Sequence, residues 1–486
     1  MIARLMNGRF VGYLLQGILF LWLAAGINLQ HDIGLADNGD YARSMGMFSV
    51  GPVGMEGRRP IEGTERWSLR YADSWVPAWR LNWEWTRPNT SALLLWIPGV
   101  GVNYVFVSDS VLYLPIVSLL PKLLLALFLW LLFRWVDHHA PEKRNLLYLS
   151  LGAPALLLMT TTDYFAYMNT FYQEQASFIY LLGGLGSLVY LHRKPESAGR
   201  LLLSVALFLL LATAKASNIY WTLIGIGSAG FLWRGGTRTL RVGITVCLIT
   251  LVTFLAREIT RPGTVRVNAH HSLFYGVLAF SNEPSAHLDN LGIPPDAALC
   301  VGTHAYTGDC YFRYRSHLRF WNTPKVLLRE PLIVFRMLNH AALSMQDISA
   351  DYLAQRADDH PAYTRPADYL EAGEQRFWRG SSGTFLNAWS TIKFALFPTG
   401  GWLWAAILLF CMSFLWGLRR RGLPREISII GLVATIGCVT EMLVALLGDG
   451  KYELIKHLFL ANVLFDVGAV ALLNFAIAFA LKPPPR

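Results

Sequence analysis

Long apolar stretches recur along almost the whole chain and restrict it to a membrane-embedded fold. A helix needs roughly 20 apolar residues to cross the hydrocarbon core of a bilayer. Of the 486 residues, 54% are apolar and only 15% are charged, whereas about 25% of the residues in a soluble domain are charged. We therefore predict an all-α polytopic membrane protein with about ten transmembrane helices. The predicted spans are 10–29, 111–133, 146–162, 172–191, 200–214, 218–233, 242–259, 393–418, 427–447 and 458–481.

Basic residues cluster beside every second connection between these stretches. With ten spans, all the clusters fall on one side of the membrane, and the positive-inside rule assigns that side to the cytoplasm. Both termini are then cytoplasmic. The formal charge of +10 is explained as an orientation signal, so no nucleic-acid partner is expected. The clusters are Arg4 and Arg9; Arg134, Lys143 and Arg144; Arg193, Lys194 and Arg200; Arg234, Arg238 and Arg241; Arg419, Arg420, Arg421 and Arg425; and Lys482 and Arg486.

Two large loops lie on the extracytoplasmic side in this topology. The predicted units are a first transmembrane helix (1–29), a first outer loop with interfacial helices (30–110), a transmembrane bundle (111–259), a large outer loop or small domain (260–392) and C-terminal transmembrane helices (393–486).

The first outer loop is rich in tryptophan. Because Trp prefers the headgroup region, these residues favour a helix that lies on the membrane surface. The alternative is an aromatic platform for a sugar ring. The residues are Trp67, Trp75, Trp79, Trp83 and Trp85.

Three further features concern the segments outside the spans. The run 92–107 is too broken by Pro98 and glycines to count as a span, and we interpret it as a re-entrant or interfacial segment. A helix is expected over 324–346. Cys300 and Cys310 share the second loop and could pair if that loop is exported, or remain reduced.

Three carboxylates follow the first span within nine residues: Asp32, Asp37 and Asp40. Ionisable residues at membrane depth are costly and usually functional. Carboxylates so close together resist being charged at once, so that one is protonated or the group shares a cation. The alternative is a solvated loop in which Asp37 caps a following helix.

Further ionisable residues stand at other predicted outer ends. Glu174 begins a span, where a helix N-terminus stabilises a carboxylate, and it could also serve as an acid or as a sugar or metal ligand. Lys215, Lys456 and His457 lie on the side where basic residues are otherwise rare, which suits a bound phosphate. Snorkelling to the interface and lipid-headgroup binding are the alternatives.

Signatures of soluble enzymes are missing from the sequence. It contains no Walker A loop, dinucleotide-binding glycine turn, H-E-x-x-H motif or paired-cysteine zinc spacing,. His270 and His271 are adjacent but are not backed by further spaced ligands, so we do not predict a zinc site there.

A long outer loop that follows the first span and bears aspartates resembles the GT-C class of integral-membrane glycosyltransferases. More narrowly, several stretches are similar to bacterial glycan-biosynthesis hexose transferases of the WsfD type. These stretches are NGDY at 38–41, NTFYQE at 169–174, NAHHSLFYGVL at 268–278, LGIP at 291–294 and GDGKYELIKH at 448–457. Together they cover most of the chain.

The resemblance implies a bacterial inner-membrane enzyme of cell-envelope polysaccharide biosynthesis that acts on the outer face. Its donor would be a polyprenyl-phosphate sugar, and its acceptor would be a glycan or a glycolipid. Membrane lipid would be a further partner. A carboxylate of the first outer loop would act as the base. Asp40 matches best, Asp37 is the nearest alternative and Asp32 comes third.

The resemblance also implies roles for other residues. Lys215, Lys456, His457 and Arg43 would bind the donor phosphate, although Arg43 could equally pair with Asp40 one helical turn away. Substrate-binding candidates are Glu174, Asn169 and Tyr172. Some relatives use a divalent metal such as Mg²⁺ or Mn²⁺ and others do not, and Asp37, Asp40 and Glu174 could bind one.

Two other functions compete with sugar transfer. One is transport, or flipping, of a lipid-linked glycan. A flippase usually has polar residues throughout its spans and often repeated halves, whereas here the ionisable residues gather at one face. The other is a non-catalytic membrane subunit of a polysaccharide assembly complex, which would tolerate Asp40→Asn.

Overall fold

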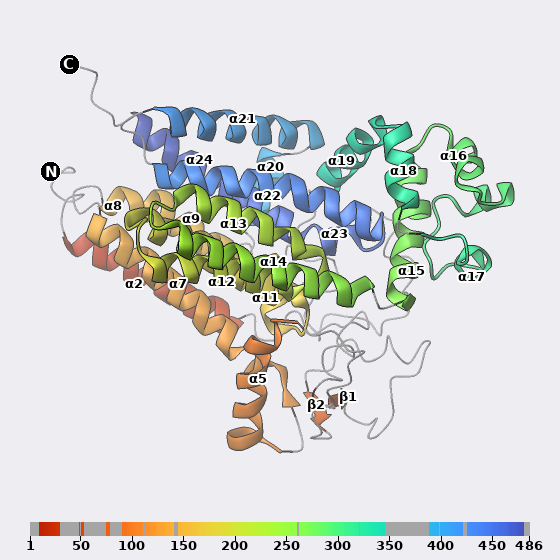
Figure 1. Ribbon diagram of the computed structural model, residues 1–486. Coiled ribbons are helices and arrows are strands. Elements are labelled where there is room, and N and C mark those ends of the chain that lie inside the picture. Colours follow the sequence, from red (N-terminus) through yellow and green to blue (C-terminus); the bar gives the residue numbers. More distant parts are fainter. Residues whose placement is uncertain are drawn as a thin grey trace.

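The computed structural model is a bundle of long helices that lie side by side (Figure 1). It describes residues 9–29, 48, 50–52, 74–77, 90–109, 112–139, 144–259, 262–319, 321–345, 388–397, 399–420 and 425–480. Each predicted span overlaps a helix of the bundle. These helices are α2 (Arg9–Leu29), α7 (Leu119–His139), α9 (Ala153–Thr160), α11 (Gln173–Arg193), α12 (Ala198–Ala214), α13 (Trp221–Leu232), α14 (Thr237–Ile259), α21 (Gly400–Arg419), α22 (Arg425–Asp449) and α24 (Phe459–Ala480).

Shorter helical segments connect the long ones. In the first half of the chain they are α5 (Leu93–Val102), η2 (Asn103–Val107), α6 (Leu114–Val117), α8 (Arg144–Leu147), η4 (Tyr148–Gly152), α10 (Thr162–Phe165), η5 (Ala166–Asn169) and η6 (Ala216–Tyr220). In the second half they are α15 (Pro262–His270), η7 (His271–Gly276), η8 (Val277–Phe280), α16 (Pro284–Leu291), η9 (Pro295–Cys300), α17 (Cys310–Tyr314), α18 (Asn322–Arg329), α19 (Leu332–Ser344), α20 (Ala388–Leu396) and α23 (Leu454–His457).

The apolar helices confirm a mostly helical membrane protein. Within the described residues, four helices are long and apolar enough to cross a bilayer, namely α7, α21, α22 and α24. The bent pair 145–160 and 163–169, with an angle of 55°, would be a fifth. Shorter apolar helices lie at Gly12–Ala24, Leu93–Val107, Ala198–Ala214 and Leu332–Ser344. The count of ten spans and the division into two outer loops stay predictions.

Helix α22 lies at the centre of the C-terminal half, and glycines let its neighbours approach closely. A Cβ on Gly437 would lie 2.6 Å from the Trp221 ring of α13, and one on Gly431 would lie 2.3 Å from the Phe414 ring of α21. Small residues at such crossings allow membrane helices to gain van der Waals contact.

Three short strands form an antiparallel sheet, which departs from the all-α prediction. Two of them lie in the first predicted outer loop, and the third lies at the start of the predicted span 111–133, whose helix α7 begins only at Leu119. β1 (Val50–Pro52) pairs with β2 (Ser74–Pro77), and β2 pairs with β3 (Leu112–Tyr113), with Trp75 opposite Leu112. The predicted surface helix is therefore wrong at Trp75, which lies in a strand. The other four tryptophans of that prediction lie outside the described residues.

The predicted helix over 324–346 is wrong because the chain breaks after Arg329. Pro331 cannot donate a backbone hydrogen bond, and helix α18 ends before it while α19 begins after it. The Glu330 carboxylate fills the break: it accepts hydrogen bonds from Ser281 Oγ at 2.6 Å and Arg336 Nη1 at 2.7 Å, and lies 3.1 Å from His287 Nε2. Burial alone would raise the pKa of Glu330, but these bonds lower it to about 2.

The segment of the second predicted outer loop also contains a disulfide. Cys300 at the end of η9 is bonded to Cys310 at the start of α17, so the structure answers the open question about this pair in favour of pairing.

The two ends of the bundle differ in what they carry (Figure 1). Helix α2 begins and α24 ends at one end, and α15 to α19 and α23 lie at the other. This arrangement places the first and last described helix ends together. The orientation across a membrane stays a prediction.

The packing of α5 on α6 can be tested by substituting Gly99. A Cβ there would lie 2.5 Å from Val117 Cα and 2.6 Å from Val117 O, which are backbone atoms that cannot rotate away. We expect Gly99→Ala to cost about 1–3 kcal/mol and to lower the thermal unfolding midpoint of the detergent-purified protein. Gly101→Ala is the control, because nothing lies within 4 Å of its Cβ. Equal midpoints for the two variants would contradict the contact.

Candidate functional site

Five elements meet where α11 begins, at the end of the bundle near α23. Helix α11 carries Glu174 in its first turn, and Lys215 stands between α12 and η6. His457 is the last residue of α23, which connects α22 to α24. Because α12 is 17 residues long, Lys215 lies about 25 Å from the basic connection at 194–197.

A chain of polar contacts links these residues. Lys215 Nζ donates to Glu174 Oε1 at 2.7 Å and lies 3.0 Å from His457 Nδ1. His457 Nε2 is 3.4 Å from Asp449 Oδ2, and Asp449 Oδ1 is 3.8 Å from His271 Nδ1. Basic and acidic side chains thus alternate along these contacts, from α11 through Lys215 and α23 to α22 and η7.

His457 is neutral in this chain at neutral pH. Burial, and then the charge of Lys215, lower the pKa of His457 to about 4, although Asp449 opposes the shift. A neutral imidazole has one acceptor and one donor nitrogen. Nδ1 therefore accepts from the Lys215 ammonium, and the proton on Nε2 faces Asp449.

Lys456 is buried beside these polar contacts, with 2% of its surface exposed. Its Nζ lies 4.4 Å from the centroid of the Tyr172 ring and 3.4 Å from Glu453 Oε2. The ring face stabilises the ammonium. Glu453 has φ 44°, a left-handed conformation that turns the chain into α23.

A tight turn positions Asp449 against η7. Gly450 has φ 60°, and a Cβ there would lie 2.7 Å from His271 O and 2.7 Å from Tyr275 C. The Lys451 amide donates to Tyr275 O at 3.3 Å. Only glycine adopts this conformation at this close approach without cost.

Aromatic rings surround His271, where this series of polar contacts ends. The His271 ring stacks on Tyr452, with centroids 4.9 Å apart, and Tyr306 lies edge-on at 5.6 Å. His304 packs on Tyr452 at 5.3 Å. Tyr306 is 65% exposed, so the cluster reaches the surface.

His271 is the unusual member of this cluster. It is 1% exposed, and among the described residues neither of its ring nitrogens has a hydrogen-bond partner, since Asp449 at 3.8 Å is too far away,. A buried polar group without a partner costs about 1–3 kcal/mol, and a ligand hydroxyl or phosphate oxygen at this position would remove that cost.

The structure brings together Glu174, Lys215, Lys456, His457 and Tyr172 from the predicted site residues. Asn169 lies at the end of η5, where its Oδ1 accepts from Ser118 Oγ at 3.4 Å. Asp32, Asp37, Asp40 and Arg43 lie outside the described residues.

The described residues do not form a metal site at Glu174. They contain no group of three or more His, Cys, Asp or Glu side chains that could hold an ion. The Glu174 carboxylate is already paired with Lys215. The predicted role of a divalent metal at Asp37 and Asp40 is not tested.

Two members of the polar chain were missed as site residues by sequence reasoning. Asp449 stands in the GDG stretch that carried the resemblance, and His271 was considered only as a zinc ligand. The signal for both was their place inside stretches that resemble one family.

A buried charged cluster also lies within the predicted spans. Lys393 Nζ is 2.9 Å from Asp466 Oδ1 and donates to Asn462 Oδ1 at 2.8 Å. Trp389 Nε1 donates to Asp466 at 2.7 Å, and the Tyr164 hydroxyl donates to the same carboxylate. The sequence signal was a single aspartate inside a long apolar stretch.

A family model described as the YfdI N-terminal transmembrane domain matches residues 17–482. The chain belongs to the YfdI family. No match to it was found among curated proteins or among solved structures. Since the YfdI match runs from α2 into α24, it includes every element of the candidate site.

The buried pair in this YfdI-family chain can be tested by its stability. Removing one partner of a buried ion pair costs about 3–5 kcal/mol. Because 19% of the Lys215 side chain is exposed, solvent weakens the pair. We therefore expect Glu174→Gln to lower the free energy of unfolding, measured in detergent, by an amount at the low end of that range. Adding Lys215→Met to Glu174→Gln should cost less than the sum of the single changes.

Arg313→Gln is the matched control for that experiment. Arg313 pairs with Asp296 at 2.8 Å, but the two side chains are 64% and 44% exposed, and exposed pairs contribute about 0–1 kcal/mol. If Glu174→Gln costs no more than Arg313→Gln, the buried pairing is wrong.

The lowered pKa of His457 predicts a dependence on pH. Between pH 6.5 and 4 the unfolded chain binds a proton at this residue and the folded chain does not, so stability is lost as the pH falls through this window. From pH 7 to pH 5 the loss at His457 is about 2 kcal/mol. The wild type should therefore lose that much more unfolding free energy than His457→Gln. Parallel pH profiles would contradict a neutral His457.

Proposed function

We propose that this chain is a GT-C-like glycosyltransferase of the bacterial inner membrane, with relatives of the WsfD type. It transfers a sugar from a polyprenyl-phosphate donor to a cell-surface glycan or glycolipid on the extracytoplasmic face. The observation that supports this most is a pair of ammonium groups near the end of α12 and in α23. Lys215 contacts Glu174 and His457, and Lys456 contacts Glu453 and the Tyr172 ring. Membership of the YfdI family is compatible with a membrane glycosyltransferase.

Transfer makes a bond between the acceptor oxygen and the anomeric carbon and breaks the bond from that carbon to the phosphate oxygen. The phosphate leaves with the bonding electrons, and the acceptor hydroxyl gives its proton to a base. Lys215 and Lys456 stabilise the charge that develops on the phosphate, which is the largest electrostatic change in the reaction. Both are fixed before the donor arrives, because Glu174, Glu453 and the Tyr172 ring hold them.

The base is assigned to Asp40, with Asp37 and Asp32 as alternatives, on the resemblance of the NGDY stretch alone. Arg43 would add a third cation for the phosphate. Asp37 and Asp40 offer the oxygen ligands that Mg²⁺ or Mn²⁺ prefers, and the chemistry that a bound ion supplies is to neutralise phosphate charge.

The aromatic cluster around His271 supports a sugar site. Sugar C–H faces pack well on aromatic rings, and Tyr306 and Tyr452 present such rings beside Asp449. The unpartnered ring nitrogens of His271 can bond a sugar hydroxyl. A sugar on these rings would lie beside Asp449, which contacts His457 and, through it, Lys215.

Transport of a lipid-linked glycan is the second candidate, and the Lys393–Asp466 pair favours it. Charged residues inside spans mark many transport pathways. This pair is fully enclosed by Trp389, Tyr164 and Asn462, which argues for a structural role, so we rank transfer first.

A detergent assay separates the two candidates, because it contains no compartments to transport between. Purified protein is mixed with a synthetic polyprenyl-phosphate hexose and lipid-linked acceptor, and the release of polyprenyl phosphate is measured. We expect release by the wild type, about 100-fold or more slowing by Asp40→Asn and about 100-fold slowing by Lys215→Gln. Arg313→Gln should behave as the wild type.

The same variants can be compared in cells at equal membrane levels. Loss of one surface sugar in the deletion strain and in Asp40→Asn, with its polyprenyl-phosphate form retained, is the expected result. If only the deletion has an effect, and if detergent release is absent for the wild type, transport or scaffolding replaces the proposal.

A further inference from the structure

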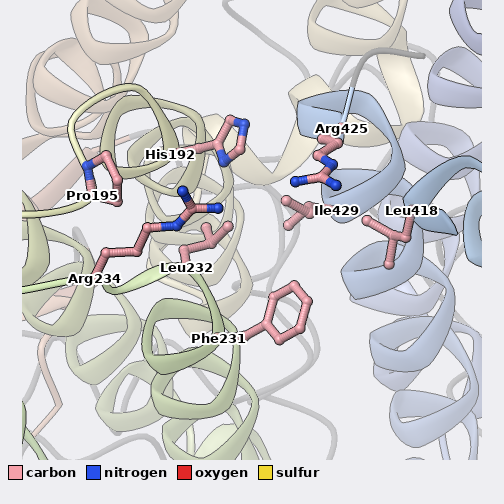
Figure 2. Close-up of a pocket in the computed structure, with 8 residues that line it drawn as sticks. All are labelled: His192, Pro195, Phe231, Leu232, Arg234, Leu418, Arg425 and Ile429. Atoms are coloured by element: carbon pink, nitrogen blue, oxygen red, sulfur yellow. The ribbon is translucent and has the colours of Figure 1, made fainter. Parts of the chain in front are cut away.

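A cleft opens at the other end of the bundle, where α11 and α13 face α21 and α22. Its volume is about 340 Å³, at the low end of the roughly 300–1,000 Å³ of small-ligand sites. Figure 2 shows Arg234 and Arg425 directed toward the same space from opposite sides, with His192 above it and Phe231 below it in this view. The cleft therefore combines basic side chains with apolar ones, among them Phe231, Leu418 and Ile429.

The three basic side chains come from three places in the chain. His192 is in the last turn of α11, Arg234 follows α13, and Arg425 begins α22. His192 Nε2 is 3.8 Å from Glu426 Oε1. In the described part of the chain no carboxylate pairs with the guanidinium of Arg234 or Arg425. The cleft thus holds two guanidinium groups that no described carboxylate pairs with.

One apolar side chain of the cleft is exposed on the outside of the bundle. Phe231 is 74% exposed on the outside of the helix bundle, whereas Leu232 and Ile429 are buried beside it. Helices α13 and α21 both end here, at Leu232 and Arg419, and the ends of apolar helices mark the depth of the lipid headgroups. A ligand at this depth can have a charged head and an apolar tail.

We propose that the cleft binds the headgroup of an anionic phospholipid. The phosphate lies between Arg234 and Arg425, since guanidinium groups bind phosphate oxygens in a fixed, bidentate geometry. An acyl chain follows Phe231, Leu418 and Ile429 along the outside of the bundle. The volume accommodates a headgroup but not a whole lipid, which leaves the tails in the bilayer.

Such a lipid joins two parts of the chain that are far apart in sequence. Arg234 belongs to the N-terminal half and Arg425 to the C-terminal half, and a shared phosphate holds α13 and α22 together. A ligand that binds only the folded protein stabilises it by mass action.

The test uses the purified full chain in a neutral detergent. The thermal unfolding midpoint and lipid adducts in native mass spectrometry are measured with added phosphatidylglycerol, phosphatidylcholine, polyprenyl phosphate or inorganic phosphate. We expect phosphatidylglycerol to raise the midpoint in a saturable manner, and Arg234→Gln combined with Arg425→Gln to weaken its binding at least tenfold. Arg238→Gln changes a basic residue in the first turn of α14 that does not line the cleft, and this variant should bind as the wild type.

Several outcomes overturn the proposal. They are an equal effect of phosphatidylcholine, an equal effect of inorganic phosphate, tenfold tighter binding of polyprenyl phosphate, or equal binding by the double variant and Arg238→Gln. The unfolding midpoint of the double variant without lipid shows whether it is folded. If it is not, Arg425→Gln alone is used, with an expected weakening of at least threefold.

Discussion

The bond from Lys215 to Glu174 is the interaction on which the candidate site depends. An ammonium buried at the end of an apolar helix is tolerated only when an opposite charge meets it there, and Glu174 at 2.7 Å supplies that charge. The pair fixes the end of α12 to the start of α11. Because His457 accepts from the same ammonium, the connection between α22 and α24 is brought to this point as well.

The Gly450 turn links the Lys215–Glu174 pair to η7. Its left-handed backbone lies against His271 and Tyr275, so Asp449 faces both His457 and His271. One chain of contacts then couples the bundle to η7 and to the rings of Tyr306 and Tyr452. Without a side chain at residue 450 the two backbones meet, and with one they cannot.

Apolar stretches predicted the helices well because hydrocarbon thickness and helix rise set their lengths. They did not give the number of spans, since α13 has 12 residues and α7 starts at Leu119. Lys215, Lys456 and His457 were predictable because charges at apolar ends are rare. The contacts of Asp449 and His271 were not, because they depend on a turn packing against a segment about 175 residues earlier in the sequence. The proposed base, Asp40, rests on resemblance.

The basic side chains at the two ends of the bundle differ in their partners. Near α23, each cation faces a carboxylate or an imidazole, and a donor phosphate must compete with Glu174 for Lys215. A neutral His457 eases that exchange, because it leaves no third positive charge to repel the lysines. At the cleft, no carboxylate of the described residues pairs with Arg234 or Arg425, and in our proposal the phosphate of a lipid supplies the counter-charge. The first arrangement suits a ligand that binds and leaves, and the second suits one that stays.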